Sequence, residues 1–176
     1  MQRALLVIAP RTFRDEEYLE PRAVLETAGV SVTTASLAAG PCVGRFGARA
    51  TAEVGISDVD GGTYDAVIFV GGGGASVFFD DPEAHRVARE AAEGGRVLGA
   101  ICIAPSTLAR AGLLRGVRAT AFPSQEEDLI AHGAIWTGAP VETDGLIVTA
   151  NGPEAATAFG MRLVELLTGI SADTQD

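Results

Sequence analysis

The chain has 176 residues, 47% of them apolar and 20% charged, which is typical of one globular domain and excludes a disordered chain. Its formal net charge is −10, so we expect no nucleic-acid partner, because phosphate neutralisation needs a basic face. None of its 13 basic residues is a lysine, which excludes Schiff-base chemistry. Without a signal peptide or a long apolar segment, we expect a cytoplasmic protein with no membrane contact.

Apolar runs alternate with amphipathic segments along the chain. The expected strands are residues 3–9, 30–36, 52–59, 66–70, 97–101, 117–122, 134–136, 141–143 and 146–150, and the expected helices are residues 21–28, 82–93, 104–111, 124–132 and 153–168. Residues 37–49 are rich in glycine and are expected to be irregular. The alternation predicts one α/β domain over residues 1–176, a mostly parallel central sheet with helices on both faces.

In sheets of this kind, ligands bind beyond the carboxyl ends of the strands. Three segments follow strands in this way: residues 10–17, 71–76 and 102–105. We therefore expect any chemistry of this protein to be carried by these three segments.

The strongest chemical signal is Cys102, in the run AICIAP of residues 100–105. Ala100 and Ala104 supply the small residues that a sharp strand-to-helix turn, the nucleophile elbow, needs on either side of its nucleophile. A helix N-terminus favours an anion, so we expect a thiol with a lowered pKa. The alternative is an inert buried cysteine, which is the common fate of a free thiol. Cys42 has no such context, and we interpret it as structural or incidental.

Backbone amides and a nearby acid would support such a thiol. Ile103 N–H follows the nucleophile, and the backbone of Gly71 and Gly72 can approach it closely and complete an oxyanion hole, although a flexible turn is the alternative. The first loop carries the acids Asp15, Glu16 and Glu17, any of which could shuttle a proton or simply flank a helix N-terminus.

Histidine and metal chemistry have little support. His85 and His132 both lie on expected helices, far in sequence from Cys102 and from each other. Two histidines and two cysteines, all dispersed, make a metal site improbable, and no nucleotide-binding fingerprint follows the first strand. We expect no cofactor.

Four segments together resemble the ThiJ/PfpI superfamily of DJ-one-like proteins and PfpI-type intracellular peptidases. They are FRDEEYLEP (residues 13–21), YDAVIFVGG (64–72), AICIAP (100–105) and VETDGLIVTANGPEAATAFGMRLVELLTG (141–169), in the order typical of that family. The resemblance implies a flavodoxin-like three-layer sandwich of the class I glutamine amidotransferase-like type, and a homodimer or higher oligomer.

The resemblance also implies roles for particular residues. Cys102 is the implied nucleophile, with backbone donors near Gly72 and Ile103 and an acid beside the sulfur. Asp15 aligns best with that acid by counting back from the proline of the same segment, with Glu17 or Glu16 as the alternative.

The chain departs from the family pattern at both usual histidine positions. The residue after the cysteine is Ile103, where the peptidases have histidine, and the strand-end pair that contributes to the pocket is Phe122-Pro123 in place of His-Pro. These departures count against protease activity, which needs a base that also protonates an amine leaving group.

Three functions remain. The first is a cysteine-dependent, cofactor-independent enzyme on a small electrophile, with glyoxalase- or deglycase-like chemistry on 2-oxoaldehydes or their adducts. The second is an oxidative-stress sensor that works through oxidation of Cys102, with Cys42 as its one candidate resolving thiol. The third is an intracellular cysteine peptidase or amidase that takes a histidine from a neighbouring subunit.

Overall fold

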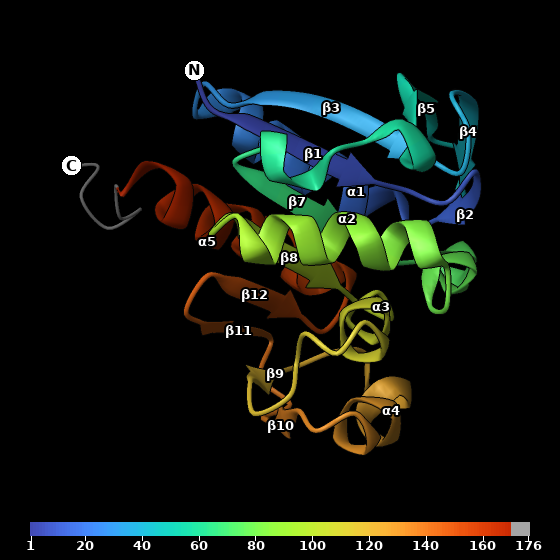
Figure 1. Ribbon diagram of the computed structural model, residues 1–176. Coiled ribbons are helices and arrows are strands. Elements are labelled where there is room, and N and C mark those ends of the chain that lie inside the picture. The colour runs from blue at the N-terminus through green and yellow to red at the C-terminus, as the bar shows by residue number, and fades with distance from the viewer. Residues whose placement is uncertain (170–176) are drawn as a thin grey trace.

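The computed structural model describes residues 1–169 and has the predicted three-layer α/β architecture (Figure 1). Its central sheet has the strand order β11-β12-β8-β7-β1-β3-β6, in which every neighbouring pair is parallel except β11 with β12. In that order the strands are Val141–Asp144, Ile147–Ala150, Val97–Ile101, Ala66–Phe69, Arg3–Val7, Ser31–Ser36 and Val54–Gly55. The central strands β1, β7 and β8 are buried on both faces, which explains their continuous apolar sequences.

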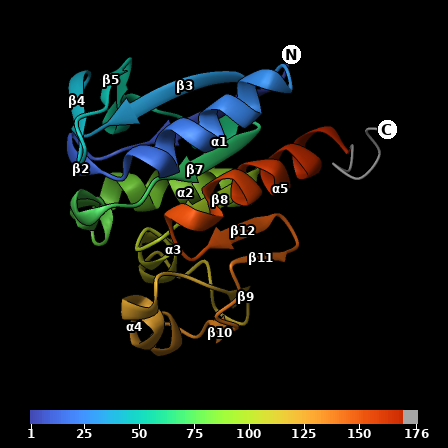
Figure 2. The same ribbon diagram turned by 180° about the vertical axis from the view of Figure 1, so that it is seen from behind.

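Helices cover both faces of this sheet. Helices α1 (Asp15–Thr27) and α5 (Ala156–Thr168) pack side by side on one face, and α2 (Pro82–Glu93) and α3 (Pro105–Arg110) lie on the other (Figures 1 and 2). A separate apolar cluster fills each of the two layers between helices and sheet. Helix α4 (Glu126–Ala131) lies beside a two-stranded parallel sheet of β9 (Arg118–Ala119) and β10 (Ile135–Trp136).

Some of the sequence-based boundaries hold, whereas those of the first helix and of the predicted strands 52–59 and 117–122 fail. Helix α2 and strand β8 have the predicted bounds, and the Asp81 side chain caps α2 by accepting a hydrogen bond from Glu83 N–H. Helix α1 begins at Asp15, six residues before the predicted start, because its acidic first turn stabilises the helix N-terminus and Pro21 is tolerated inside it. Helix α1 packs closely on α5 at this proline, since a Cβ at Gly160 of α5 would lie 2.9 Å from Pro21 Cα.

The expectation of an irregular segment over residues 37–49 was wrong. This segment contributes β4 (Gly40–Gly44) and the start of β5 (Arg49–Ala52), an antiparallel hairpin to which β2 (Arg11–Phe13) adds in parallel. The predicted strand of residues 117–122 is likewise only two residues long. The small β2-β4-β5 sheet brings the hairpin beside the first strand-end loop.

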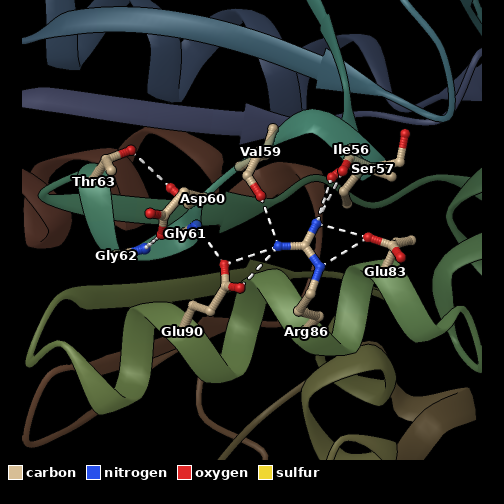
Figure 3. Close-up of polar contacts among 10 residues, drawn as sticks. All are labelled: Ile56, Ser57, Val59, Asp60, Gly61, Gly62, Thr63, Glu83, Arg86 and Glu90. Atoms are coloured by element: carbon tan, nitrogen blue, oxygen red, sulfur yellow. Dashed lines mark hydrogen bonds and ion pairs between the residues drawn. The ribbon is translucent and has the colours of Figure 1, made fainter.

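Helix α2 is tied to the irregular connection between β6 and β7 by Arg86 (Figure 3). Its guanidinium donates to the carbonyl oxygens of Val59 at 2.7 Å and Ile56 at 3.1 Å, and it pairs with Glu83 and Glu90 on its own helix. Glu90 in turn accepts a hydrogen bond from Gly61 N–H. One side chain thus gives Val59 O a donor and adds a second one to Ile56 O, which also accepts from Val59 N–H.

No helix of the described chain is long and apolar enough to span a membrane. The carboxyl ends of β1, β7 and β8 meet at one edge of the sheet, because these strands are adjacent and parallel. The three segments that follow them are therefore neighbours in space, as the sequence predicted.

Candidate active site

Cys102 lies on a strained turn between β8 and α3. Its φ is +64°, a left-handed conformation that costs a residue with a side chain of the order of 1–3 kcal/mol unless its surroundings impose it. The backbone imposes it here, since Cys102 N–H donates to Ala150 O at 2.9 Å and Cys102 O accepts from Phe122 N–H at 2.8 Å. The side chain is partly exposed. This geometry is that of the predicted nucleophile elbow.

The register of the sheet explains why Gly71 and Gly72 lie beside the thiol. Phe69 of β7 pairs with Ala100 of β8, so the residues two positions further along face each other. A Cβ on Gly71 would lie 2.6 Å from the Cys102 Cβ and 2.5 Å from Glu17 Oε1. Gly72 has a φ of +98° and its backbone abuts Arg14, so neither position has room for a side chain.

Glu17 is the acid that contacts Cys102. It occupies the first turn of α1, its side chain is fully buried, and its carboxyl lies against the Cys102 side chain. No other group among residues 1–169 donates a hydrogen bond to either carboxylate oxygen. A buried carboxyl without an N–H or hydroxyl donor is costly in its charged form, so it retains its proton more readily than an exposed one.

Asp15 does not have the position expected from the family alignment. Its Oδ1 accepts a hydrogen bond from Phe46 N–H at 3.1 Å and its Oδ2 accepts one from Ala48 N–H at 3.0 Å. Both oxygens therefore hold the turn between β4 and β5, and the helical geometry of α1 directs Glu17 to the sulfur instead. Glu16 is also excluded from this contact, because it is half-exposed and pairs with Arg14.

Burial controls the electrostatics of the pair. It raises the pKa of Glu17 from 4.5 to about 7, and only the contacts with Cys102 and the charge of Arg14 lower it. Burial, followed by the charge of Glu17, raises the pKa of the Cys102 thiol to about 12, whereas hydrogen bonds from Gly72 N–H and Ile103 N–H act to lower it. The expected lowering by the helix N-terminus is outweighed, because α3 has only six residues and the sulfur is largely removed from water.

This arrangement places a base beside an unionised thiol. A carboxyl with a pKa of about 7 is half ionised at neutral pH, where a general base works best. The ionised Glu17 can take the thiol proton as the sulfur attacks an electrophile, and the Gly72 and Ile103 amides can hold the negative charge that forms.

Two residues of the site went unrecognised in the sequence. Arg14 is the residue before α1, and its guanidinium stacks on the Phe46 ring at 4.8 Å from the centroid. Arg14 lies in a strand-end segment whose acids alone were considered, and Phe46 lies in the segment thought to be irregular. The position of Arg14 directly before three acids was the signal that could have identified this residue.

The predicted pocket pair lies next to the elbow. Phe122 and Pro123 line a surface cavity of about 240 Å³ together with the loop of residues 151–154. Phe122 is 44% exposed and its backbone N–H donates to the carbonyl oxygen of Cys102, so one residue of the cavity lining is bonded to the backbone of the candidate nucleophile.

The two histidines and Cys42 have partners away from Cys102. His85 Nε2 lies 2.6 Å from Phe79 O and His132 Nδ1 lies 2.8 Å from Asp128 O, so a backbone carbonyl occupies one nitrogen of each ring. Cys42 is buried in β4, where its Sγ lies 3.8 Å from Gly40 O. Within the described residues, no three histidine, cysteine or acidic side chains gather as a metal site would require.

Comparison with known proteins supports the relationship inferred from these motifs. The chain is 39% identical over 168 residues to an uncharacterized protein of Methanocaldococcus jannaschii, covering 94% of this chain and 82% of that one. It is 29% identical to a deglycase of Pyrococcus abyssi, covering 93% and 98% of the two chains. Further relatives are a glutathione-independent glyoxalase of Caenorhabditis elegans at 27% identity and a Bacillus subtilis protein named as a candidate cysteine protease at 33%.

Solved structures share the fold over nearly the whole chain. The crystal structure of a ThiJ/PfpI domain protein from Brachyspira murdochii superimposes with a TM-score of 0.93 at 29% identity, covering 96% of this chain and 98% of that one. The DJ-1/PfpI family model matches residues 2–166. With the elbow cysteine, the parallel sheet and the buried acid in one arrangement, this chain belongs to the DJ-1/PfpI family.

Proposed function

We propose that this protein is a cysteine-dependent, cofactor-independent enzyme that converts 2-oxoaldehydes, or their adducts with amines and thiols, to 2-hydroxy acids. The observation that carries this proposal is the buried carboxyl of Glu17 against Cys102, with the N–H groups of Gly72 and Ile103 close enough to the sulfur to act on its pKa. Relatives named as a deglycase and a glyoxalase are consistent with it.

The chemistry needs one nucleophile, one acid–base group and water. The Cys102 sulfur forms a C–S bond to the aldehyde carbon while Glu17 takes its proton, and the π electrons move to the oxygen, which the amides stabilise. Glu17 returns the proton to that oxygen. The aldehyde hydrogen then moves as a proton, through an enediol, to the neighbouring carbon as the ketone is reduced and a thioester forms. Water hydrolyses the thioester, releasing the 2-hydroxy acid and the thiol.

This route suits a site without a histidine. A free aldehyde expels no amine. An amine or thiol adduct first collapses to the aldehyde as its C–N or C–S bond breaks and its hydroxyl proton passes through Glu17 to the departing nitrogen or sulfur, so one carboxyl can handle every proton. Peptide hydrolysis must instead protonate the nitrogen of an amide, a much poorer leaving group. Because His85 and His132 each bond a backbone carbonyl, we favour 2-oxoaldehyde chemistry over a peptidase.

The test is steady-state consumption of methylglyoxal by the wild type, Cys102→Ser and Glu17→Gln, with Cys42→Ser as the matched thiol control. We expect many turnovers by the wild type and Cys42→Ser, and a loss of at least about a hundredfold in each of the other two. A wild-type thiol that is oxidised by peroxide but gives no turnover would overturn the enzyme and favour the redox sensor, which reacts once.

A further inference from the structure

The guanidinium of Arg14 is fixed on two sides at the edge of the candidate active site. Its Nε donates to Glu16 Oε2 at 2.7 Å, and its plane stacks on the ring of Phe46. The turn that carries Phe46 is itself held by the two hydrogen bonds to Asp15. A side chain restrained in this way loses little conformational freedom when it binds a ligand.

The donors at the far end of this side chain are free. None of residues 1–169 accepts a hydrogen bond from Nη1 or Nη2 of Arg14, whose side chain is 27% exposed. An arginine fork with two unused N–H groups matches the two oxygens of a carboxylate.

Arg14 is also adjacent to the nucleophile. Its backbone N–H donates to Gly71 O at 3.0 Å, and a Cβ at Gly71 would lie 2.6 Å from the Cys102 Cβ. The hydrogen bond to Glu16 is the main cause that raises the pKa of Arg14, and negative charge on Glu17 or Cys102 adds to it, so the guanidinium is within electrostatic reach of both. The chain has a net charge of −10, so an anionic substrate is repelled by most of the protein, and a cation with free donors at this position would attract it locally.

We propose that Arg14 binds a carboxylate of the substrate, so that the site selects electrophiles carrying a carboxylate near the carbon that Cys102 attacks. This inference rests on the proposed function in its substrate class: the preferred molecules are 2-oxoaldehyde adducts of free or N-acylated amino acids, which keep their carboxylate. Adducts in which that group is an amide bind less well. Glu16 holds the guanidinium in place and neutralises part of its charge.

The first test does not depend on turnover. Iodoacetate and iodoacetamide differ only in a carboxylate against a carboxamide, and each alkylates Cys102 by forming a C–S bond and releasing iodide. The ratio of the two second-order rate constants, divided by the same ratio for glutathione, measures carboxylate recognition. A change in the thiol pKa cancels from this ratio because it acts on both reagents.

We expect a normalised ratio of at least about 10 in the wild type, because one charge-assisted hydrogen bond of ordinary strength corresponds to about a tenfold factor. Arg14→Gln should return it to about one, and Arg14→Lys, which keeps the charge without the fork, should give an intermediate value. Arg45→Gln is the matched control, because Arg45 stacks on the same Phe46 ring at 5.5 Å. It should keep the wild-type ratio.

A wild-type ratio of one would overturn the inference without any variant, as would a raised ratio that Arg14→Gln leaves intact. The second measurement is turnover of the methylglyoxal hemithioacetals of N-acetylcysteine and of its amide, which differ in the same group. A raised alkylation ratio with no turnover of either would reject the proposed function and leave carboxylate recognition standing. Turnover of both hemithioacetals at equal rates would support the proposed function and reject carboxylate recognition by Arg14.

Discussion

Replacing Glu17 by glutamine should change how the stability of the protein depends on pH. The folded carboxyl has a pKa of about 7 against an ordinary value of 4.5, because burial disfavours its charge. The folded state therefore binds a proton that the unfolded chain has already released between these two values. Stability from this group is complete below pH 4.5 and is lost as the pH rises to about 7.

Each pH unit between the two values corresponds to about 1.4 kcal/mol, so the wild type should lose roughly 3 kcal/mol more than Glu17→Gln over this window. The measurement is the free energy of unfolding by urea from about pH 5 to about pH 8, compared as a difference between the two proteins. Glu93→Gln, at the exposed end of α2, controls for the loss of a charge. If the free energy of unfolding changed with pH in the same way for the wild type and Glu17→Gln, the raised pKa of the buried carboxyl would be refuted.

Three further changes test other parts of the structure. Gly71→Ala places a Cβ within 2.6 Å of the Cys102 Cβ, so we expect about 1–3 kcal/mol lower stability by urea unfolding and at least about tenfold slower alkylation of Cys102 by iodoacetamide. Asp15→Asn weakens the hydrogen bonds to Phe46 and Ala48 and should cost about 1–2 kcal/mol, yet leave the pH profile of that alkylation unchanged; a lost inflection would make Asp15 the acid after all. Arg86→Leu leaves Val59 O without the donor that Arg86 supplies and removes one of the two donors to Ile56 O, and we expect a loss of about 2 kcal/mol after allowance for the partial exposure of Arg86, read from the urea midpoint.

The sequence alone determined the architecture and the strand-to-helix turn that carries the candidate nucleophile, Cys102. Continuous apolar runs as short as residues 66–69 are typical of strands buried on both faces, and their alternation with amphipathic helices indicates a parallel sheet. Ala100 and Ala104 around Cys102 identify the elbow because crowding at so sharp a turn excludes larger side chains. Local sterics and hydrophobic periodicity are properties of neighbouring residues, so both could be inferred without the fold.

The choice between Asp15 and Glu17 was left to the tertiary structure. These residues lie two positions apart in the first turn of α1, and the start of that helix decides which carboxyl faces the sulfur and which accepts from the β4–β5 turn. The raised pKa of Cys102 is likewise set by packing, since burial outweighs the amides that the sequence suggested. Side-chain direction and desolvation depend on elements that are far apart in the sequence, and no local pattern encodes them.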